Sequence, residues 1–145
     1  MDTAERLAIE MACIRVVNEY AYLVDFRDYD RFADLFAEEC VFDVGGQTVS
    51  SREEMRIGVK KTPVDPLRRH VTTNILIDVI DENSASGVAY FTVYRAKSDD
   101  GTDQTPASMP AVVGHYRDKF VRTADGWKFA ERIGVFDMID RAPGA

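Results

Sequence analysis

The sequence predicts an α+β fold in which helices come first and an antiparallel sheet follows. Residues 3–26 contain neither proline nor glycine and carry apolar residues at helical spacing. Four later runs are rich in Val, Ile, Thr and aromatic residues, as strands are: 70–81, 86–97, 111–123 and 127–137. Helices followed by consecutive strands are typical of helices packed on one face of a sheet. We expect one domain, because 145 residues are enough for a single core or pocket.

Shorter elements lie between the first helix and the strands. A helix is predicted over 31–37, after Asp residues suited to an N-cap, and a strand over 40–44, ended by two glycines. A Ser-x-x-Glu capping box predicts a third helix over 51–61, which two prolines then end. The long polar connection over 98–110 is predicted to form a mobile flap over a site.

Composition limits the partners and the compartment. A net charge of −7 and a pI near 4.8 argue against nucleic acid or an anionic membrane as a partner. No apolar run approaches the ~20 residues that span a bilayer. The N-terminal residues lack the pattern of a signal peptide, and Cys13 and Cys40 fit reduced core residues. We therefore expect a cytoplasmic protein.

Asp25 is the first candidate for a functional residue, because it lies on an apolar face of the first helix. At ~100° per residue, four apolar residues fall within about 40° of it: Leu7, Met11, Ile14 and Ala21. A carboxylate that faces a core needs a partner. The chain has two histidines, His70 and His115. Capping of the second helix, or pairing with Arg27 or Arg132, are the alternatives for Asp25.

The alternation of residues along the strands favours His70 as that partner. It places His70, Thr72, Asn74 and Leu76 on one side of their strand, as expected for a cavity wall with a few polar groups. His115 alternates with Val113, Arg117 and Lys119, which predicts an ordinary surface residue. His70 as a satisfied core histidine remains an alternative.

Several segments together resemble the SnoaL-like branch of the nuclear-transport-factor-2-like superfamily. They are Tyr20-Ala-Tyr22-Leu-Val-Asp25-Phe-Arg-Asp28, Phe32-Ala-Asp-Leu-Phe36, His70-Val-Thr-Thr-Asn74, Gly114-His-Tyr-Arg-Asp118 and Gly126-Trp-Lys-Phe-Ala-Glu-Arg132. The resemblance covers nearly the whole chain and implies a cone formed by a curved antiparallel sheet and three N-terminal helices, with an apolar pocket at its open end. That branch includes scytalone dehydratase, bile-acid dehydratases and hexachlorocyclohexane dehydrochlorinase, which eliminate without a cofactor. Polyketide cyclases, ketosteroid isomerases and non-catalytic subunits of ring-hydroxylating dioxygenases are further relatives.

The resemblance also suggests roles for single residues. Asp25 and His70 match the Asp–His dyad of the dehydratases and the dehydrochlorinase, and Tyr22 resembles the helix tyrosine of the dehydratases. Tyr20 competes for that role, but Tyr22 lies three residues before Asp25, on its side of the helix. Tyr20 also stands where the dehydrochlorinase has a lysine.

Four further residues are candidates for substrate contacts: Asn18, Asn74, Tyr116 and Arg132. Asn18 lies about 20° from Asp25 on the helix, and Arg132 matches a late-strand arginine of the dehydrochlorinase. The alternatives are core packing for Asn18, local backbone hydrogen bonds for Asn74 and a structural salt bridge for Arg132.

This residue set predicts a cofactor-free lyase that eliminates water or a similar group from a small hydrophobic, cyclic or aromatic substrate. Imidazole takes up protons near neutral pH, and a carboxylate on its other nitrogen stabilises the imidazolium. An isomerase or polyketide cyclase with the same acid–base set, or a non-catalytic ligand-binding or subunit module, is the alternative. The two histidines and two cysteines are too scattered for a zinc site, so neither metal nor cofactor is expected. We expect a pocket of about 300–1,000 Å³ lined by Tyr22, Asp25 and His70, and a homodimer or homotrimer.

Overall fold

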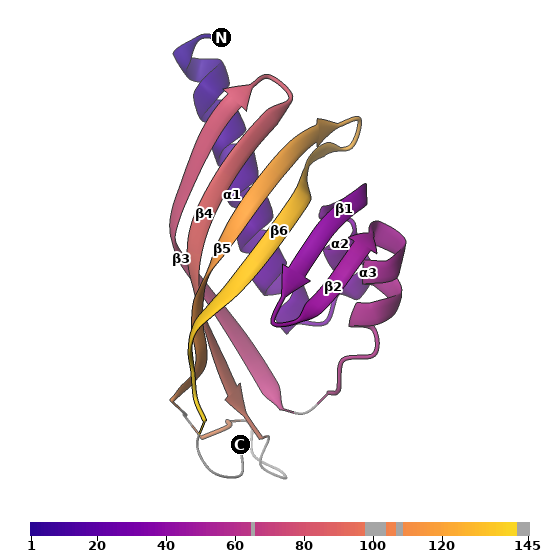
Figure 1. Ribbon diagram of the computed structural model, residues 1–145, viewed down its shortest axis with the longest axis vertical. Helices are drawn as coiled ribbons and strands as arrows, with labels where there is room; N and C mark the ends of the chain where they lie inside the picture. Colours follow the sequence, from indigo (N-terminus) through magenta and orange to yellow (C-terminus); the bar gives the residue numbers. More distant parts are fainter. Residues whose placement is uncertain (65, 98–103, 107–108, 142–145) are drawn as a thin grey trace.

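The computed structural model describes residues 1–64, 66–97, 104–106 and 109–141, which form three helices and one six-stranded sheet (Figure 1). The helices are α1 (Thr3–Asp25), α2 (Tyr29–Ala33) and α3 (Arg52–Val59). The strands are β1 (Phe36–Val44), β2 (Gln47–Ser51), β3 (Leu67–Asp81), β4 (Ser84–Ala96), β5 (Pro110–Thr123) and β6 (Gly126–Ile139). None of the described helices has the length and apolarity needed to cross a bilayer.

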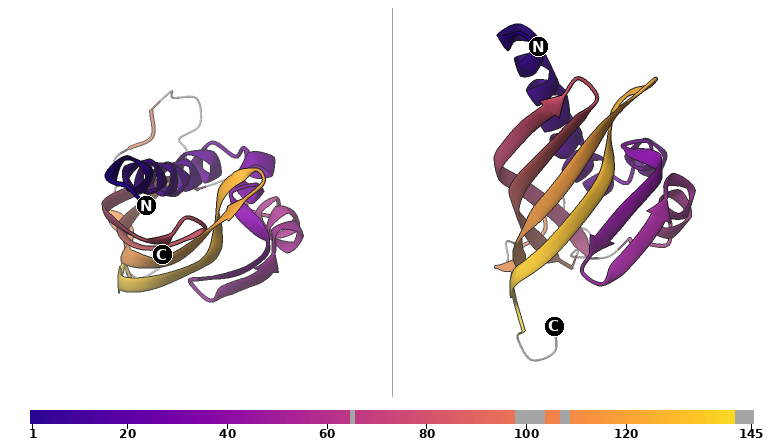
Figure 2. Two further views of the ribbon diagram at one scale, coloured as in Figure 1. Left: turned by 90° about the horizontal axis from the view of Figure 1, so that it is seen from above. Right: turned by 45° about the horizontal axis from the view of Figure 1, so that its top comes forward.

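The sheet is curved, and α1 lies across its inner face (Figure 2). Its strand order is β2-β1-β6-β5-β4-β3. The predicted α+β fold is confirmed, and the four long strands differ from their predicted ranges by at most three residues at either end. The expectation of a wholly antiparallel sheet is wrong at one place, because β1 and β6 pair in parallel. The predicted flap over 98–110 lies mostly outside the described residues.

The elements that precede β3 differ more from the prediction. Helix α2 ends at Ala33 and β1 already begins at Phe36, so the predicted helix over 31–37 is too long. Strand β2 was not predicted; it pairs with β1 through a tight turn at Gly45 and Gly46. Both glycines have positive φ, 60° and 82°, as a two-residue hairpin turn requires. The predicted capping box of α3 forms only in part: the Glu54 amide donates to the Ser51 hydroxyl, but the Glu54 carboxylate accepts from the amide and hydroxyl of Ser50 instead of from the Ser51 amide.

Helix α1 packs on the sheet with a different face from the one predicted. Leu7 and Met11 are 54% and 64% exposed. The buried residues of the helix are instead Ile9, Cys13, Val16, Val17, Tyr20, Ala21 and Leu23. The helix carries two apolar stripes, and the one formed by Ile9, Cys13, Val16 and Tyr20 faces the sheet. Asp25 therefore lies at the flank of the buried face, beside β3.

A bulge in β3 changes which residues point inward. Register with β4 shifts between Thr73 and Leu76, and Asn74 between them has φ 54°. Because a bulge adds one residue, the inward positions change from even to odd numbers. Before the bulge the inward side chains are those of Arg68, His70 and Thr72, and after it they are those of Ile75, Ile77 and Val79.

Candidate functional site

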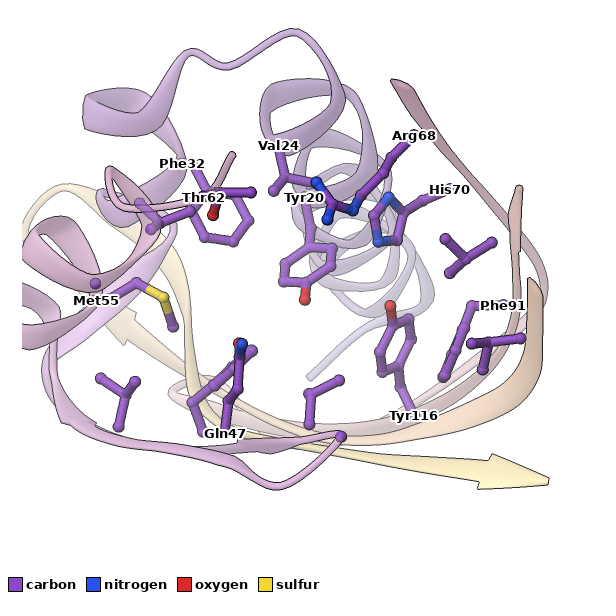
Figure 3. Close-up of a pocket in the computed structure, with 18 of the residues that line it drawn as sticks. Tyr20, Val24, Phe32, Gln47, Met55, Thr62, Arg68, His70, Phe91 and Tyr116 are labelled. Carbon is purple, nitrogen blue, oxygen red and sulfur yellow. The ribbon is translucent and has the colours of Figure 1, made fainter. Parts of the chain in front are cut away.

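A pocket of about 560 Å³ opens between the C-terminal half of α1, the inner face of the sheet and α3 (Figure 3). Its volume lies within the predicted range. Most of its lining is apolar, and the residues used below are Tyr20, Val24, Met55, Arg68, His70, Phe91, Arg95 and Tyr116. No Asp or Glu is among the described residues that line it. The pocket therefore has apolar walls and a few polar groups, as small-molecule sites do.

The end of α1 is built so that Asp25 lies beside β3. The Asp2 side chain and Glu5 form a capping box at the helix start. At the other end, the Asp28 amide donates to the Leu23 carbonyl and the Arg27 amide to that of Val24, which together form a Schellman motif.

Arg27 occupies the left-handed position of that motif, with φ 63°, where glycine is usual. Its guanidinium donates to the carbonyls of Thr62 and Pro63. These bonds offset the strain of the left-handed backbone and hold the segment after α3 against the end of α1.

Asp25 makes two hydrogen bonds to one residue, His70. One carboxylate oxygen accepts from the His70 backbone amide at 2.7 Å, and the other lies 2.6 Å from His70 Nδ1. The side chains are 5% and 16% exposed. Since a carboxylate only accepts hydrogen bonds, Nδ1 carries the hydrogen of this contact, and in a neutral ring Nε2 then holds the lone pair. Figure 3 shows the His70 ring with this second nitrogen directed into the pocket.

The predicted Asp25–His70 contact is thus present, within the expected 3.2 Å. His70 lines the main pocket, whereas Asp25 lies behind it and lines a smaller neighbouring cavity together with His70. The expectation that Asp25 itself lines the main pocket is therefore wrong.

Two tyrosines supply hydroxyl groups to the pocket. Tyr20 and Tyr116 are 5% and 1% exposed, their ring centroids lie 5.7 Å apart, and their hydroxyls lie side by side at the pocket (Figure 3). Burial raises the pKa of both, although the charge of Arg132 acts in the opposite direction. Both hydroxyls are therefore protonated at neutral pH and able to donate hydrogen bonds. Tyr116 lines the pocket, and its contact with a substrate stays a prediction.

Arg132 packs against the rings of these two tyrosines. It is fully buried, and its guanidinium makes two 2.8 Å bonds to the carboxylate of Asp118. Its Cζ lies 3.7 Å from the ring centroid of Tyr116 and 4.3 Å from that of Tyr20. Arg132 does not line the pocket. This burial contradicts the prediction that Arg132 contacts the substrate. The alternative, a structural salt bridge, is what the structure shows.

Two predicted residues on α1 point away from the pocket. Tyr22 is 60% exposed and stacks on Phe26, and Asn18 is exposed beside it in a shallow outer groove. Both were predicted from their angular distance to Asp25. Asp25 lies at the edge of the buried face of the helix. Residues close to Asp25 but farther from the sheet, such as Tyr22 and Asn18, therefore face solvent. Tyr20, the competing residue, takes the inward position.

Asn74 is also misplaced by the prediction. It occupies the bulge of β3 and is exposed. Asn adopts positive φ more readily than most residues, so its role there is to allow the bulge. His115 lies outside the pocket, as predicted, and its Nδ1 is 2.7 Å from the carboxylate of Asp137.

Sequence reasoning missed the two arginines at the pocket, Arg68 and Arg95. The sequence could have indicated Arg68, because residues two apart in a strand point to the same side and Arg68 is two residues before His70. Arg95 becomes visible only with the register, which places it opposite Arg68. Among the described residues, no three His, Cys, Asp or Glu side chains gather as metal ligands would.

Comparison with known proteins finds a family model that matches most of the chain. Residues 5–133 match the family model of the SnoaL-like domain. A candidate scytalone dehydratase from Novosphingobium aromaticivorans is similar in structure, with a TM-score of 0.77 and 22% identity, over 96% of this chain and 91% of that one. Comparison with curated proteins gave no match.

Two further structures share the fold. The hexachlorocyclohexane dehydrochlorinase LinA type 2 has a TM-score of 0.80 and 16% identity, over 99% of this chain and 95% of that one. An NTF2-like protein with a cystatin-like fold, also from Novosphingobium aromaticivorans, has a TM-score of 0.75 and 18% identity, over 94% and 86%. At these identities the likeness concerns the fold.

Proposed function

The chain belongs to the SnoaL-like domain family, and on that premise we propose that it is a cofactor-independent lyase that removes water or a similar leaving group from a small cyclic or aromatic substrate. The observation that carries the proposal is the Asp25–His70 pair, with Nδ1 bound to the carboxylate and Nε2 directed into an apolar pocket. A module that only binds a ligand has no need for such a pair.

The proposed reaction begins at a carbon next to a carbonyl group. His70 Nε2 takes a proton from that carbon, and the electron pair of the broken C–H bond moves toward the carbonyl oxygen. Asp25 holds the ring in one tautomer and stabilises the imidazolium that forms. The hydroxyls of Tyr20 and Tyr116 donate hydrogen bonds to the carbonyl oxygen as negative charge builds on it.

The leaving group departs from the neighbouring carbon in the second half of the reaction. The electron pair returns to form the carbon–carbon double bond, and the C–O bond to the leaving hydroxyl breaks. The imidazolium of His70 gives its proton to that hydroxyl, which leaves as water. The base is thereby regenerated, and no oxidant or reductant is consumed.

The first experiment measures proton abstraction separately from elimination. A panel of cyclic β-hydroxy ketones is incubated with the enzyme in D₂O. NMR follows exchange of the proton next to the carbonyl, and ultraviolet absorbance follows the conjugated product. Exchange together with new absorbance supports a lyase, while exchange with rearrangement and no loss of water supports the isomerase or cyclase variant.

Variants then test each role on any active substrate. We expect His70→Gln to lower turnover by ~10²-fold or more, and Asp25→Asn to lower turnover with less effect on substrate affinity. Tyr20→Phe should reduce turnover less, roughly tenfold, because Tyr116 remains as a donor. Tyr22→Phe is the matched control on the same helix and should leave turnover unchanged. Full activity in His70→Gln would rule out the proposed base.

A further inference from the structure

Two arginines lie next to each other at the edge of the pocket. Arg68 on β3 and Arg95 on β4 are direct partners in the antiparallel register, and both line the pocket. Residues opposite each other in such a pair have Cα atoms about 4.5–5.5 Å apart. Arg68 is two residues before His70 and on the same inward face, and Figure 3 shows its guanidinium over the pocket between Val24 and His70.

The charges around this pair are unusual for the chain. The whole sequence has a net charge of −7, yet the charged side chains among the described lining residues are these two arginines, with His70 beside them. The Arg68 guanidinium makes no hydrogen bond or ion pair with any described residue. Burial, and then the charge of Arg68, lower the pKa of Arg95. Two guanidinium groups therefore adjoin the same pocket, and an acid group of a bound molecule would meet positive charge there.

We propose that Arg68 and Arg95 bind a carboxylate group of the substrate, so that the pocket takes a cyclic or aromatic acid. The apolar ring fills the pocket beside Phe91 and Met55, and the acid group remains at the arginine pair. Guanidinium groups match carboxylates through paired N–H···O bonds, which adds orientation to the attraction. The position of Arg68 relative to His70 fixes which ring carbon is presented to Nε2.

The identification of the acid as a substrate rests on the proposed function, whereas its binding is measured without turnover. The probes are 2-naphthoate and its neutral counterpart 2-naphthamide, which share one ring system. Isothermal titration calorimetry gives both dissociation constants in low salt and in 0.3 M NaCl. We expect the acid to bind at least ~10-fold more tightly than the amide in low salt, and that preference to shrink with added salt.

The variants are Arg68→Gln, Arg95→Gln and the double change, with Arg117→Gln as a control. Arg117 is exposed on β5, does not line the pocket, and its replacement changes the net charge by the same amount. Each single change should weaken naphthoate binding, and the double variant should bind acid and amide about equally. Arg68→Lys, which keeps the charge, should retain most of the preference, and Arg117→Gln all of it. Far-UV circular dichroism checks that each variant is folded.

The outcomes separate this proposal from the proposed function. Equal binding of acid and amide by the wild type, or an acid preference that survives in the folded double variant, overturns the arginine site. The acid preference should persist in His70→Gln, which lacks the proposed base. A protein that binds naphthoate through the arginines but turns over none of the panel would keep the site and lose the lyase. A protein that turns over neutral ketones and shows no preference for the acid would keep the lyase and lose the arginine site.

Discussion

Replacing Asp118 with asparagine removes the negative partner of a buried arginine while keeping the size of the side chain. Asp118 and Arg132 are 1% and 0% exposed in their side chains and joined by two 2.8 Å bonds. Removing one charge from a buried pair typically costs about 3–5 kcal/mol, because the other charge stays buried and uncompensated. Domains are stable by roughly 5–15 kcal/mol. We therefore expect Asp118→Asn to remove about a fifth or more of the free energy of unfolding.

The neighbouring residues on the same two strands provide a matched control. Lys119 and Glu131 also oppose each other in the register of β5 and β6, and their charged groups lie 3.4 Å apart. Lys119 is 68% exposed, so solvent screens this pair. Glu131→Gln should consequently cost less than about 1 kcal/mol. The two substitutions make the same chemical change one strand position apart and differ mainly in burial.

Urea unfolding measures both variants, followed by the fluorescence of Trp127, the one tryptophan of the chain, and by far-UV circular dichroism. A cost for Asp118→Asn no larger than that of Glu131→Gln would refute the reasoning. A second variant, Asp118→Leu with Arg132→Met, removes both charges and should be more stable than Asp118→Asn. If it is equally unstable, packing of the aromatic rings around Arg132 outweighs the electrostatic contribution.

Two further results are expected. Asn74→Val should lower stability by about 1–2 kcal/mol in thermal melts, because a β-branched residue tolerates φ 54° poorly, whereas Asn74→Gly should be nearly neutral; equal melting temperatures would contradict this. Burial raises the pKa of Cys13 to about 12 and that of Tyr20 above its usual value, so the folded chain keeps protons that the unfolded chain loses. Stability should therefore fall as the pH rises from about 9 to 11. Tyr20→Phe should lessen that fall and Tyr22→Phe should not, as melting temperatures across this range will show.

Local patterns in the sequence were enough to predict most of the elements. The long proline-free helix and the four β-rich runs of the second half required only periodicity and propensity. The contact between Asp25 and His70 followed from scarcity, because the chain has two histidines and one of them shares its strand face with cations. The conclusion was correct although the helix face on which it rested was not.

The remaining predictions fail where two apolar stripes of one helix compete, or where one extra residue in a strand reverses which side chains point inward. Helix α1 has two apolar stripes, and only tertiary packing decides that the stripe of Tyr20 rather than that of Tyr22 meets the sheet. The bulge at Asn74 adds a single residue to β3, which moves Leu76 from the predicted inner face to solvent. The Arg68–Arg95 pair depends on the register between two strands, which no pattern within either strand specifies.

The parallel pairing of β1 with β6 has a consequence for how the protein is made. Phe36, at the start of β1, is the register partner of Phe129 in β6, and their ring centroids are 5.2 Å apart. A ribosome therefore completes nearly nine tenths of the polypeptide before Phe129, the aromatic partner of β1, exists. Contacts so distant along the chain are characteristic of slow folding. Until the last strand emerges, the nascent chain exposes an unpaired strand edge and an aromatic surface, the features that favour chaperone binding during synthesis.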